Sequence, residues 1–369
     1  MKDRILRIFH DLAPQPDALV FVNSIEPHLD QSFFYVFDTA SGLFEGSAAI
    51  ALPDGSLHVS TSQLEEESAL QAAKHDPHVD VHLVKKMDDR KSWFAKMLPA
   101  GGTIGLNFHE LTHEDYLSLA GGLPKATWSD VGAAVRKARR VKDAREVERI
   151  REAARIGSVV GEEIPSMLKR GITESELASE IEYRMMRLGA SGRSFATIVG
   201  FGAHSAEPHY SPASTKLEPG MSIVCDFGAF YHRYASDITR SFRFGPTDPE
   251  LKRVHETVEA AQQASFAAIR AGVPGKEVHL AAQRVIDASP WKGRFTHGVG
   301  HSIGLAVHDG YGMGDSTEDP LETGMAITVE PGIYLPGKGG VRIEDDVLVT
   351  ANGFEALTTT RRSYLEVPG

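Results

Sequence analysis

The sequence predicts two domains, a smaller α/β domain followed by a larger α+β domain. The chain has 369 residues, which is long enough for two hydrophobic cores. Its first ~125 residues alternate short apolar runs with helical stretches, as α/β domains do. The remainder runs helix, helix and strands, and then repeats that order. The repeat indicates an internally duplicated α+β domain.

The first region contains apolar runs of the length and composition typical of strands. These predicted strands are Ala18–Val22, Phe33–Phe37, Ser47–Ala51, Val79–Val84 and Thr103–Phe108. Two helices are expected, over Gln63–Lys74 and about Glu110–Leu119. The region closes at Gly121–Pro124, because adjacent glycines and a proline favour a turn.

The second region begins in the charged stretch Arg136–Arg151. Apolar residues at helical spacing and start signals such as the capping box of Thr173 and Glu176 predict four helices. These helices are Val147–Leu168, Thr173–Leu188, Asp248–Arg270 and Gly275–Ala288. The predicted strands are Phe195–Gly200, Met221–Phe227, Ala235–Phe244, Met325–Val329, Val341–Ile343 and Val347–Thr350.

The composition is that of an ordinary globular protein, with 41% hydrophobic and 24% charged residues. A net charge of −11 argues against nucleic acid or a membrane surface as partner, since both are anionic. No apolar run approaches the ~20 residues that span a bilayer, and the charged N-terminus does not resemble a secretory signal. One cysteine, Cys225, excludes an intrachain disulfide. We therefore expect a cytoplasmic protein.

The most informative stretch is residues 297–309, His-Gly-Val-Gly-His-Ser-Ile-Gly-Leu-Ala-Val-His-Asp. Its three histidines do not share one helix face, and the interleaved glycines disfavour a helix. Histidine is a common metal ligand and acid–base group, so an irregular or extended segment that presents histidines to a site is the better interpretation. A glycine-rich surface loop with incidental histidines is the alternative.

Four carboxylates accompany this segment, and most of them lie in or beside apolar, β-branched runs. They are Asp226, Asp237, Glu330 and Glu344. Acidic residues are depleted in strands and costly to bury unpaired. Any single one could be a solvated strand end, but four flanking the histidine segment favour a metal site. Their four negative charges balance two divalent cations, and oxygen ligands suit manganese.

These motifs resemble those of the pita-bread metallopeptidases, which include methionine aminopeptidase, aminopeptidase P and prolidase. The metal ligands of that family occur in the order Asp, Asp, His, Glu, Glu, which Asp226, Asp237, His301, Glu330 and Glu344 match. The resemblance implies a pita-bread catalytic domain with pseudo-twofold halves. We assign residues 1–125 to the N-terminal domain, 126–141 to a linker and 142–369 to the catalytic domain. The resemblance also implies that the protein forms a homodimer.

The resemblance implies two divalent metal ions, manganese first, with cobalt, zinc or iron as alternatives. Glu330 would move the proton that the metal-bridging water loses on becoming hydroxide to the leaving proline nitrogen. His308 would contact the substrate carbonyl, and His297 and His209 the substrate and the tetrahedral intermediate. His204, five residues before His209, is the alternative choice. Arg342 would brace a carboxylate ligand, unless it simply faces solvent.

Cys225 could suggest a thiol nucleophile, but strand alternation points it away from Asp226. A buried, inert thiol is expected. The chain also departs from many prolidases after His308, where it reads Asp-Gly-Tyr-Gly-Met without the proline and arginine that help to bind a dipeptide carboxylate.

The leading hypothesis is hydrolysis of Xaa-Pro dipeptides. Aminopeptidase P activity on longer peptides and a catalytically silent peptide-binding module are the alternatives.

Overall fold

The chain divides into two compact units, Met1–Arg139 and Arg140–Gly369, which we call the N-terminal and C-terminal units. The computed structural model describes residues 1–74, 76–85, 87–246 and 248–369. The segment 126–141, expected to be a linker, contains a strand and a helix. The strand Thr127–Asp130 pairs in parallel with Thr103–Leu106. The division between the units falls after this strand.

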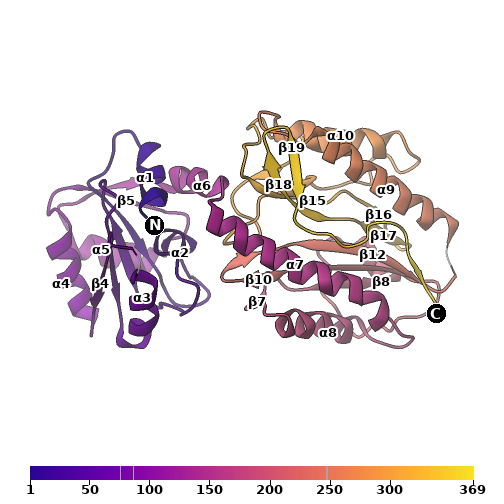
Figure 1. The fold of residues 1–369 in the computed structure, drawn as a ribbon, viewed down its shortest axis with the longest axis horizontal. Coiled ribbons are helices and arrows are strands. Elements are labelled where there is room, and N and C mark those ends of the chain that lie inside the picture. Colours follow the sequence, from indigo (N-terminus) through magenta and orange to yellow (C-terminus); the bar gives the residue numbers. More distant parts are fainter. Residues whose placement is uncertain (75, 86, 247) are drawn as a thin grey trace. The chain divides into compact units, whose positions relative to one another are not determined.

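The N-terminal unit, drawn in the indigo to purple colours of Figure 1, is built on a six-stranded mixed sheet. The order of its strands is β4-β3-β2-β1-β5-β6. Its strands are β1 Ala18–Val22, β2 Ala48–Ala51, β3 Leu57–Thr61, β4 Val79–Leu83, β5 Thr103–Leu106 and β6 Thr127–Asp130. Its helices are α1 Lys2–His10, α2 Gln31–Phe37, η1 Gln63–Glu65, α3 Glu66–Ala73, α4 Met87–Met97, α5 His113–Gly122 and α6 Gly132–Arg140. Apolar residues of β1, β2, β5, α4 and α5 form the core.

The expected strand Phe33–Phe37 is wrong, because these residues belong to helix α2. The Asp30 carboxylate caps this helix by accepting hydrogen bonds from the backbone N–H groups of Ser32 and Phe33. Ser32–Phe37 are all buried, so the run shows neither the alternation of a half-buried strand nor the polar face of a surface helix.

The C-terminal unit repeats an order of two helices followed by antiparallel strands. Its helices are α7 Ala144–Met167, α8 Glu174–Arg187, η2 Gly202–Ala206, α9 Pro249–Ala268 and α10 Gly275–Asp287. The strands of its first half are β7 Gly192–Arg193, β8 Ile198–Phe201, β9 Ser222–Phe227, β10 Ala229–Tyr231, β11 Tyr234–Ala235 and β12 Ile238–Phe244. Those of its second half are β13 Gly300–His301, β14 Gly312–Met313, β15 Ala326–Val329, β16 Gly332–Leu335, β17 Gly339–Arg342, β18 Asp345–Thr350, β19 Gly353–Ala356 and β20 Glu366–Val367.

Each helix pair packs against its own sheet. Apolar residues of α7 and α8 share a core with β8, β9 and β12, and those of α9 and α10 share a core with β15 and β18. The predicted capping box is present, with Thr173 and Glu176 each accepting the other's backbone N–H. The predicted α/β domain followed by an α+β domain is confirmed.

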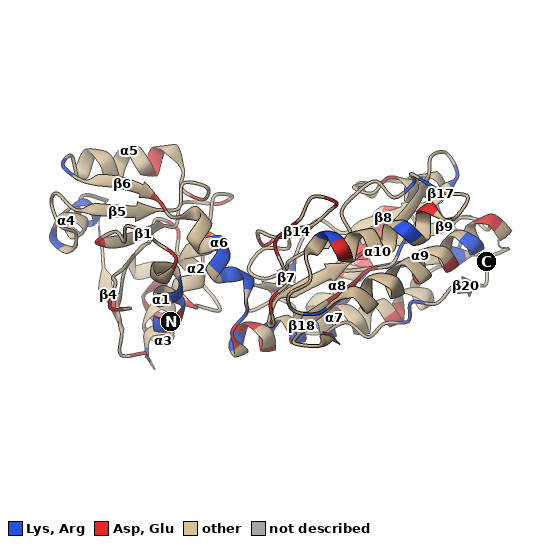
Figure 2. Ribbon diagram, turned by 90° about the horizontal axis from the view of Figure 1, so that it is seen from above, with Lys and Arg blue, Asp and Glu red and all other residues tan. Residues whose placement is uncertain are grey.

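Basic residues are frequent in the sequence on both sides of the division between the units. Figure 2 shows lysines and arginines along α6 and the segment that follows it, where the sequence reads Arg-Arg-Val-Lys at 139–142. Within the described residues, no helix is both long and apolar enough to cross a membrane.

Candidate metal centre

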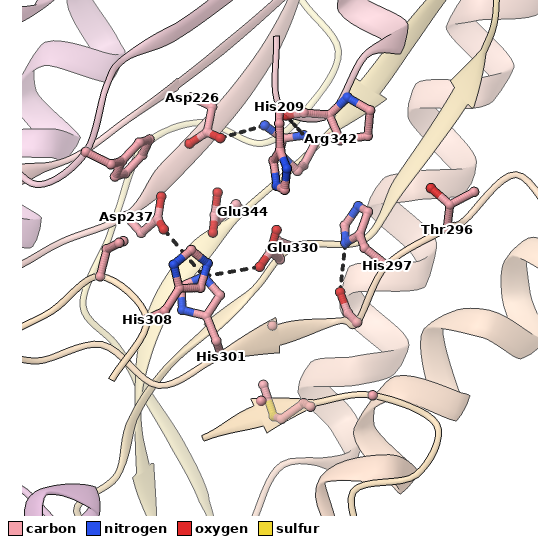
Figure 3. Close-up of a pocket in the computed structure, with 18 of the residues that line it drawn as sticks. His209, Asp226, Asp237, Thr296, His297, His301, His308, Glu330, Arg342 and Glu344 are labelled. Atoms are coloured by element: carbon pink, nitrogen blue, oxygen red, sulfur yellow. Dashed lines mark hydrogen bonds and ion pairs between the residues drawn. The ribbon is translucent and has the colours of Figure 1, made fainter. Parts of the chain in front are cut away.

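A cavity of about 800 Å³ lies within the C-terminal unit. All nine site residues expected from the sequence line it (Figure 3). They are Asp226, Asp237, His301, Glu330 and Glu344 as candidate ligands, with His209, His297, His308 and Arg342. These residues are up to 135 positions apart in the sequence, from 209 to 344, and the fold brings them to one place.

Neighbouring strands place the two aspartates. Asp226 lies in β9 opposite Thr239 of β12, and Asp237 directly precedes β12. Because side chains alternate along a strand, Cys225 projects into the core behind β9 while Asp226 lines the cavity. Burial raises the pKa of the Cys225 thiol, so the inert-thiol interpretation agrees with the structure.

His301 lies between the carboxylates. Its Nε2 atom is 3.4 Å from Glu330 Oε1 and 3.6 Å from Asp237 Oδ2. Asp237, His301 and Glu344 each offer one ligand atom, and these three atoms lie within 4.8 Å of one another. Burial lowers the pKa of His301, which favours the neutral imidazole that binds metals.

The carboxylates are arranged in a way that fits divalent cations. Asp226 Oδ1 and Asp237 Oδ1 are buried and have no hydrogen-bond partner within the described part of the chain. Burial, followed by repulsion between the carboxylates, raises the pKa of Asp237 and Glu344 well above the usual range. Burial also raises the pKa of Glu330. Uncompensated buried charges of one sign are unfavourable, so this donor set fits divalent metal ions.

Arg342 is buried rather than solvent-facing, with 3% of its surface exposed. Its Nη2 donates to Asp226 Oδ2 at 2.6 Å, and its Nε donates to Thr239 Oγ1 at 3.0 Å. Its Nη1 donates to the Tyr334 hydroxyl at 2.9 Å. The guanidinium therefore fixes Asp226 and contacts the Tyr334 hydroxyl, which is also bonded to His297.

Hydrogen bonds also fix the ring of His297. Its Nδ1 lies 2.8 Å from the carbonyl oxygen of Gly298. Because a carbonyl only accepts, Nδ1 carries the proton, and the neutral ring accepts from the Tyr334 hydroxyl at Nε2, 2.8 Å away. Both nitrogens are thus engaged within the protein, so a hydrogen bond to substrate would have to replace one of these contacts.

His209 and His308 complete the lining. The His308 ring lies beside that of His301, with 4.1 Å between the centroids and 43° between the ring planes. Burial lowers the pKa of His308 to about 4, so it is neutral at physiological pH. The alternative histidine, His204, pairs with Glu174 at 2.9 Å and stacks on Tyr210. His204 does not line the cavity, whereas His209 does.

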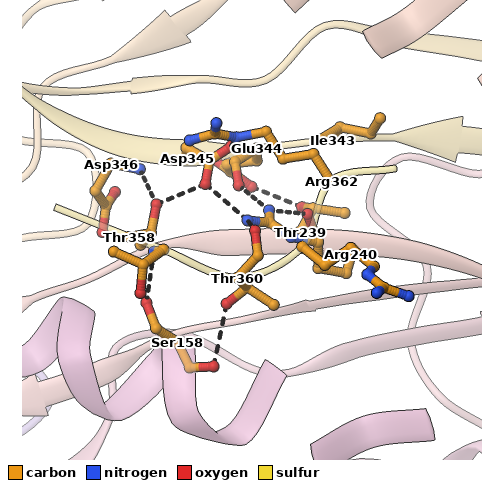
Figure 4. Close-up of polar contacts among 12 residues, drawn as sticks. Ser158, Thr239, Arg240, Ile343, Glu344, Asp345, Asp346, Thr358, Thr360 and Arg362 are labelled. Carbon is orange, nitrogen blue, oxygen red and sulfur yellow. Dashed lines mark hydrogen bonds and ion pairs between the residues drawn. The ribbon is translucent and has the colours of Figure 1, made fainter. Parts of the chain in front are cut away.

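A buried polar network supports Glu344 from the side away from the cavity (Figure 4). Thr239 Oγ1 donates to Glu344 Oε2 at 2.6 Å. Asp345 accepts from Arg240 at 2.7 Å and from Arg362 at 2.6 Å. Asp346 Oδ2 accepts the backbone N–H of Asp237 at 2.9 Å. The network therefore links Glu344, just before β18, to Asp237, just before β12.

Tyr334, Thr239 and Asp346 were not identified from the sequence. Thr239 could have been found, because it lies two residues after Asp237 in the predicted strand Ala235–Phe244, where side chains at that spacing share a face. Tyr334 and Asp346 act through contacts between distant segments, and no spacing signal marks them.

Two family profiles match the chain. Residues 148–351 match metallopeptidase family M24, and residues 17–141 match the creatinase/prolidase N-terminal domain. An uncharacterized peptidase of Staphylococcus haemolyticus is 39% identical over 63% of this chain and 66% of its own length. An uncharacterized peptidase of Staphylococcus aureus strain RF122 is 37% identical over 65% of this chain and 68% of its own length.

Solved structures resemble the chain over nearly its whole length. An X-Pro aminopeptidase from Thermotoga maritima has a TM-score of 0.87 and 31% identity, covering 99% of this chain and 100% of its own. A Xaa-Pro dipeptidase from Bacillus anthracis has a TM-score of 0.88 and 30% identity, covering 99% and 98%. The chain therefore belongs to metallopeptidase family M24, with a creatinase/prolidase N-terminal domain before its pita-bread peptidase domain.

Proposed function

We propose that this protein is a dinuclear metallopeptidase that hydrolyses the Xaa-Pro bond of dipeptides. The observation that carries the proposal is the meeting of four carboxylates and His301 in one cavity, beside His209, His297 and His308. The substrate class is supported by the solved X-Pro aminopeptidase and Xaa-Pro dipeptidase that the chain resembles.

In this proposal the five ligands are Asp226, Asp237, His301, Glu330 and Glu344. Two divalent ions, manganese first, would supply Lewis acidity toward the scissile carbonyl and the attacking water. Glu330 accepts the proton of that water and returns it to the leaving proline nitrogen. Its buried position raises its pKa, which suits a group that must hold a proton briefly.

The histidines act on the carbonyl side of the reaction. His308 is neutral at physiological pH, so its ring can donate a hydrogen bond to the oxygen that becomes negative. His209 provides a second contact from the turn that follows η2. Hydrogen bonds to Gly298 and Tyr334 hold the His297 ring in place at the edge of the cavity.

Aminopeptidase activity on longer peptides is the second candidate. Among the described residues that line the cavity, Arg342 is the only lysine or arginine, and its guanidinium is bonded to Asp226 and Tyr334. The lining thus offers no uncommitted cation to the C-terminal carboxylate of a dipeptide. Comparing kcat/KM for Ala-Pro and Ala-Pro-Ala separates the two, and equal or faster cleavage of the tripeptide would exclude the dipeptidase assignment.

The central experiment combines metal analysis with a panel of proline peptides, with and without a chelator. We expect two metal ions per chain and activity that the chelator abolishes. Glu330→Gln should remain folded and lose turnover by at least about 100-fold, whereas retained turnover would disprove the role of Glu330. Fewer than one metal per chain and no cleavage of any proline peptide would instead favour a silent peptide-binding module.

A further inference from the structure

Lys142 is a buried lysine that lies close to the start of the C-terminal unit. Its side chain has no exposed surface, and Nζ donates to Asp309 Oδ2 at 2.9 Å. The Asp309 side chain is only 5% exposed. Arg140, in the same charged stretch, forms a pair that remains partly exposed, whereas Arg139 is buried as Lys142 is. Lys142 is set apart by its partner, because Asp309 directly follows His308 in the sequence.

The partner, Asp309, closes the loop that carries His308. Its backbone N–H donates to the Ser302 carbonyl at 2.8 Å, and the Ser302 hydroxyl donates to the Asp309 carbonyl at 2.7 Å. These two bonds join the ends of the loop 302–309. His301 directly precedes the loop and His308 is its last residue before Asp309, which explains how their rings come within 4.1 Å.

The loop is shaped around the ion pair. A Cβ atom at Gly304 would lie 2.0 Å from Asp309 Oδ2 and 3.0 Å from Lys142 Nζ, so a larger side chain would displace both partners. The Gly304 carbonyl accepts the backbone N–H of Ala235 at 2.8 Å, two residues before Asp237. The pair thus lies beside the contact between the loop 302–309 and strand β11, which is followed closely by Asp237.

We propose that Lys142 and Asp309 are positioning residues that hold His308 against the metal centre. A buried ion pair contributes little net stability, but it enforces one geometry because separating the charges is costly. The proposal rests on the proposed function in one respect, namely the catalytic role given to His308. It adds Lys142, which is 166 positions before His308 in the sequence and outside every motif that identified the site.

The first test uses Lys142→Met, which keeps the length of the side chain and removes its charge. Metal content should stay at the wild-type value, because all five candidate ligands are intact. We expect kcat to fall by at least about tenfold, with KM changed by less than about threefold. The matched control is Arg170→Met, which breaks an exposed pair with Glu218 and should leave kcat unchanged. Wild-type kcat in both Lys142→Met and Asp309→Asn would overturn the proposal.

A double-mutant cycle separates positioning from general destabilisation. If Lys142 acts through His308, Lys142→Met in a His308→Ala background should lower kcat by less than about twofold. A merely structural role would give the full loss in both backgrounds, and that outcome would overturn the proposal. If Lys142→Met fails to fold, Asp309→Asn carries the same cycle, because it is nearly isosteric.

A crystal structure of Lys142→Met gives a readout that needs no substrate. The His308 ring should move from its 4.1 Å approach to His301, while Arg170→Met should keep it. An unmoved ring would overturn the proposal. If the wild-type enzyme cleaves no proline peptide, the proposed function fails, and this structural comparison still decides whether the pair positions His308.

Discussion

At the scale of single residues, Arg342 connects side chains from three separate segments of the chain. It donates to Asp226, to Thr239 and to Tyr334, and Thr239 in turn donates to Glu344. Asp226 of β9 and Glu344, which directly precedes β18, therefore both depend on one guanidinium. The planar fork of an arginine can serve all three acceptors, whereas a lysine ammonium cannot match that geometry.

We predict that Arg342→Met lowers both metal affinity and activity. The carboxylate of Asp226 would lose its 2.6 Å partner, and loss of such a support typically weakens metal binding by about 10–100-fold. Calorimetric titration of the metal-free variant with Mn²⁺ measures its metal affinity. Arg170→Met should bind as the wild type does. Unchanged Mn²⁺ affinity in Arg342→Met would contradict the bracing role.

The sequence predicts residues that lie in local motifs, and it fails for those that act by distant contact. Asp226, His301 and Glu344 each stand in a recognisable run, and all line one cavity. Lys142 looks like part of a solvated charged stretch, because nothing local indicates that it is buried against Asp309. The position of Tyr334 next to Arg342 likewise depends on the pairing of β16 with β17.

At the scale of elements, the short pair β13–β14 determines how closely the histidine segment approaches β15. Gly300 packs so tightly that a Cβ atom there would lie 2.1 Å from the Thr328 carbonyl oxygen. The hydroxyl of the same threonine accepts the backbone N–H of His301 at 3.0 Å. Gly312, across the ladder from His301, meets nothing within 4 Å.

Gly300→Ala should therefore destabilise the protein by about 1–3 kcal/mol and weaken metal binding, since His301 must move. Gly312→Ala on the facing strand should change stability by less than about 0.5 kcal/mol. Urea unfolding of both variants and the wild type measures the difference. Equal stability of the two variants would show that β13 can shift freely.

Helix α9 contains a buried histidine that makes stability depend on pH. His255 is 3% exposed, and its Nε2 donates to the Arg362 carbonyl at 2.8 Å. Burial lowers its pKa from 6.5, so the unfolded chain takes up a proton first as the pH falls. The contribution of His255 is thus fully present above about pH 6.5 and is lost below it.

His255→Gln keeps an N–H donor and does not titrate. We expect its free energy of unfolding to fall less steeply than that of the wild type between pH 6.5 and 5, by up to about 1.4 kcal/mol per pH unit. Urea unfolding at several pH values measures this slope. His10→Gln, at a side chain that is 85% exposed, is the control and should follow the wild type. A His255→Gln slope equal to that of the wild type would contradict the assignment.

Elements with strong periodicity or capping could be predicted, and short buried ones could not. Helix α8 begins at its predicted capping box. Phe33–Phe37 form a helix although aromatic runs favour strands, because the Asp30 cap and complete burial outweigh local preference. Strand β3 was not predicted, since its polar residues His58, Ser60 and Thr61 mask the apolar signal of Leu57 and Val59.

At the scale of the whole molecule, the two units have separate cores, and the candidate metal centre lies in one of them. All residues that line the cavity belong to the C-terminal unit. A ligand that binds only the folded state stabilises the unit to which it binds. Metal removal should therefore affect the two units unequally.

We predict that scanning calorimetry resolves two unfolding transitions. A chelator should lower the midpoint temperature of the C-terminal unit's transition and leave the other midpoint unchanged. With metal at about 100 times its dissociation constant, the stabilisation amounts to about 2.7 kcal/mol. Adding back Mn²⁺ should restore the transition. A chelator that shifts both transitions equally would mean that the units unfold together.

The burial of Cys225 gives the folded protein a built-in reporter of its own opening. This is the one cysteine of the sequence, and it has no exposed surface. It lies in β9 next to Asp226, with its side chain in the core that β9 shares with α7 and α8. A thiol reagent can react only during the moments when the sheet separates from α7 and α8. The rate of labelling would thus measure how often the wall that carries a candidate metal ligand comes apart, and how far bound metal holds it closed.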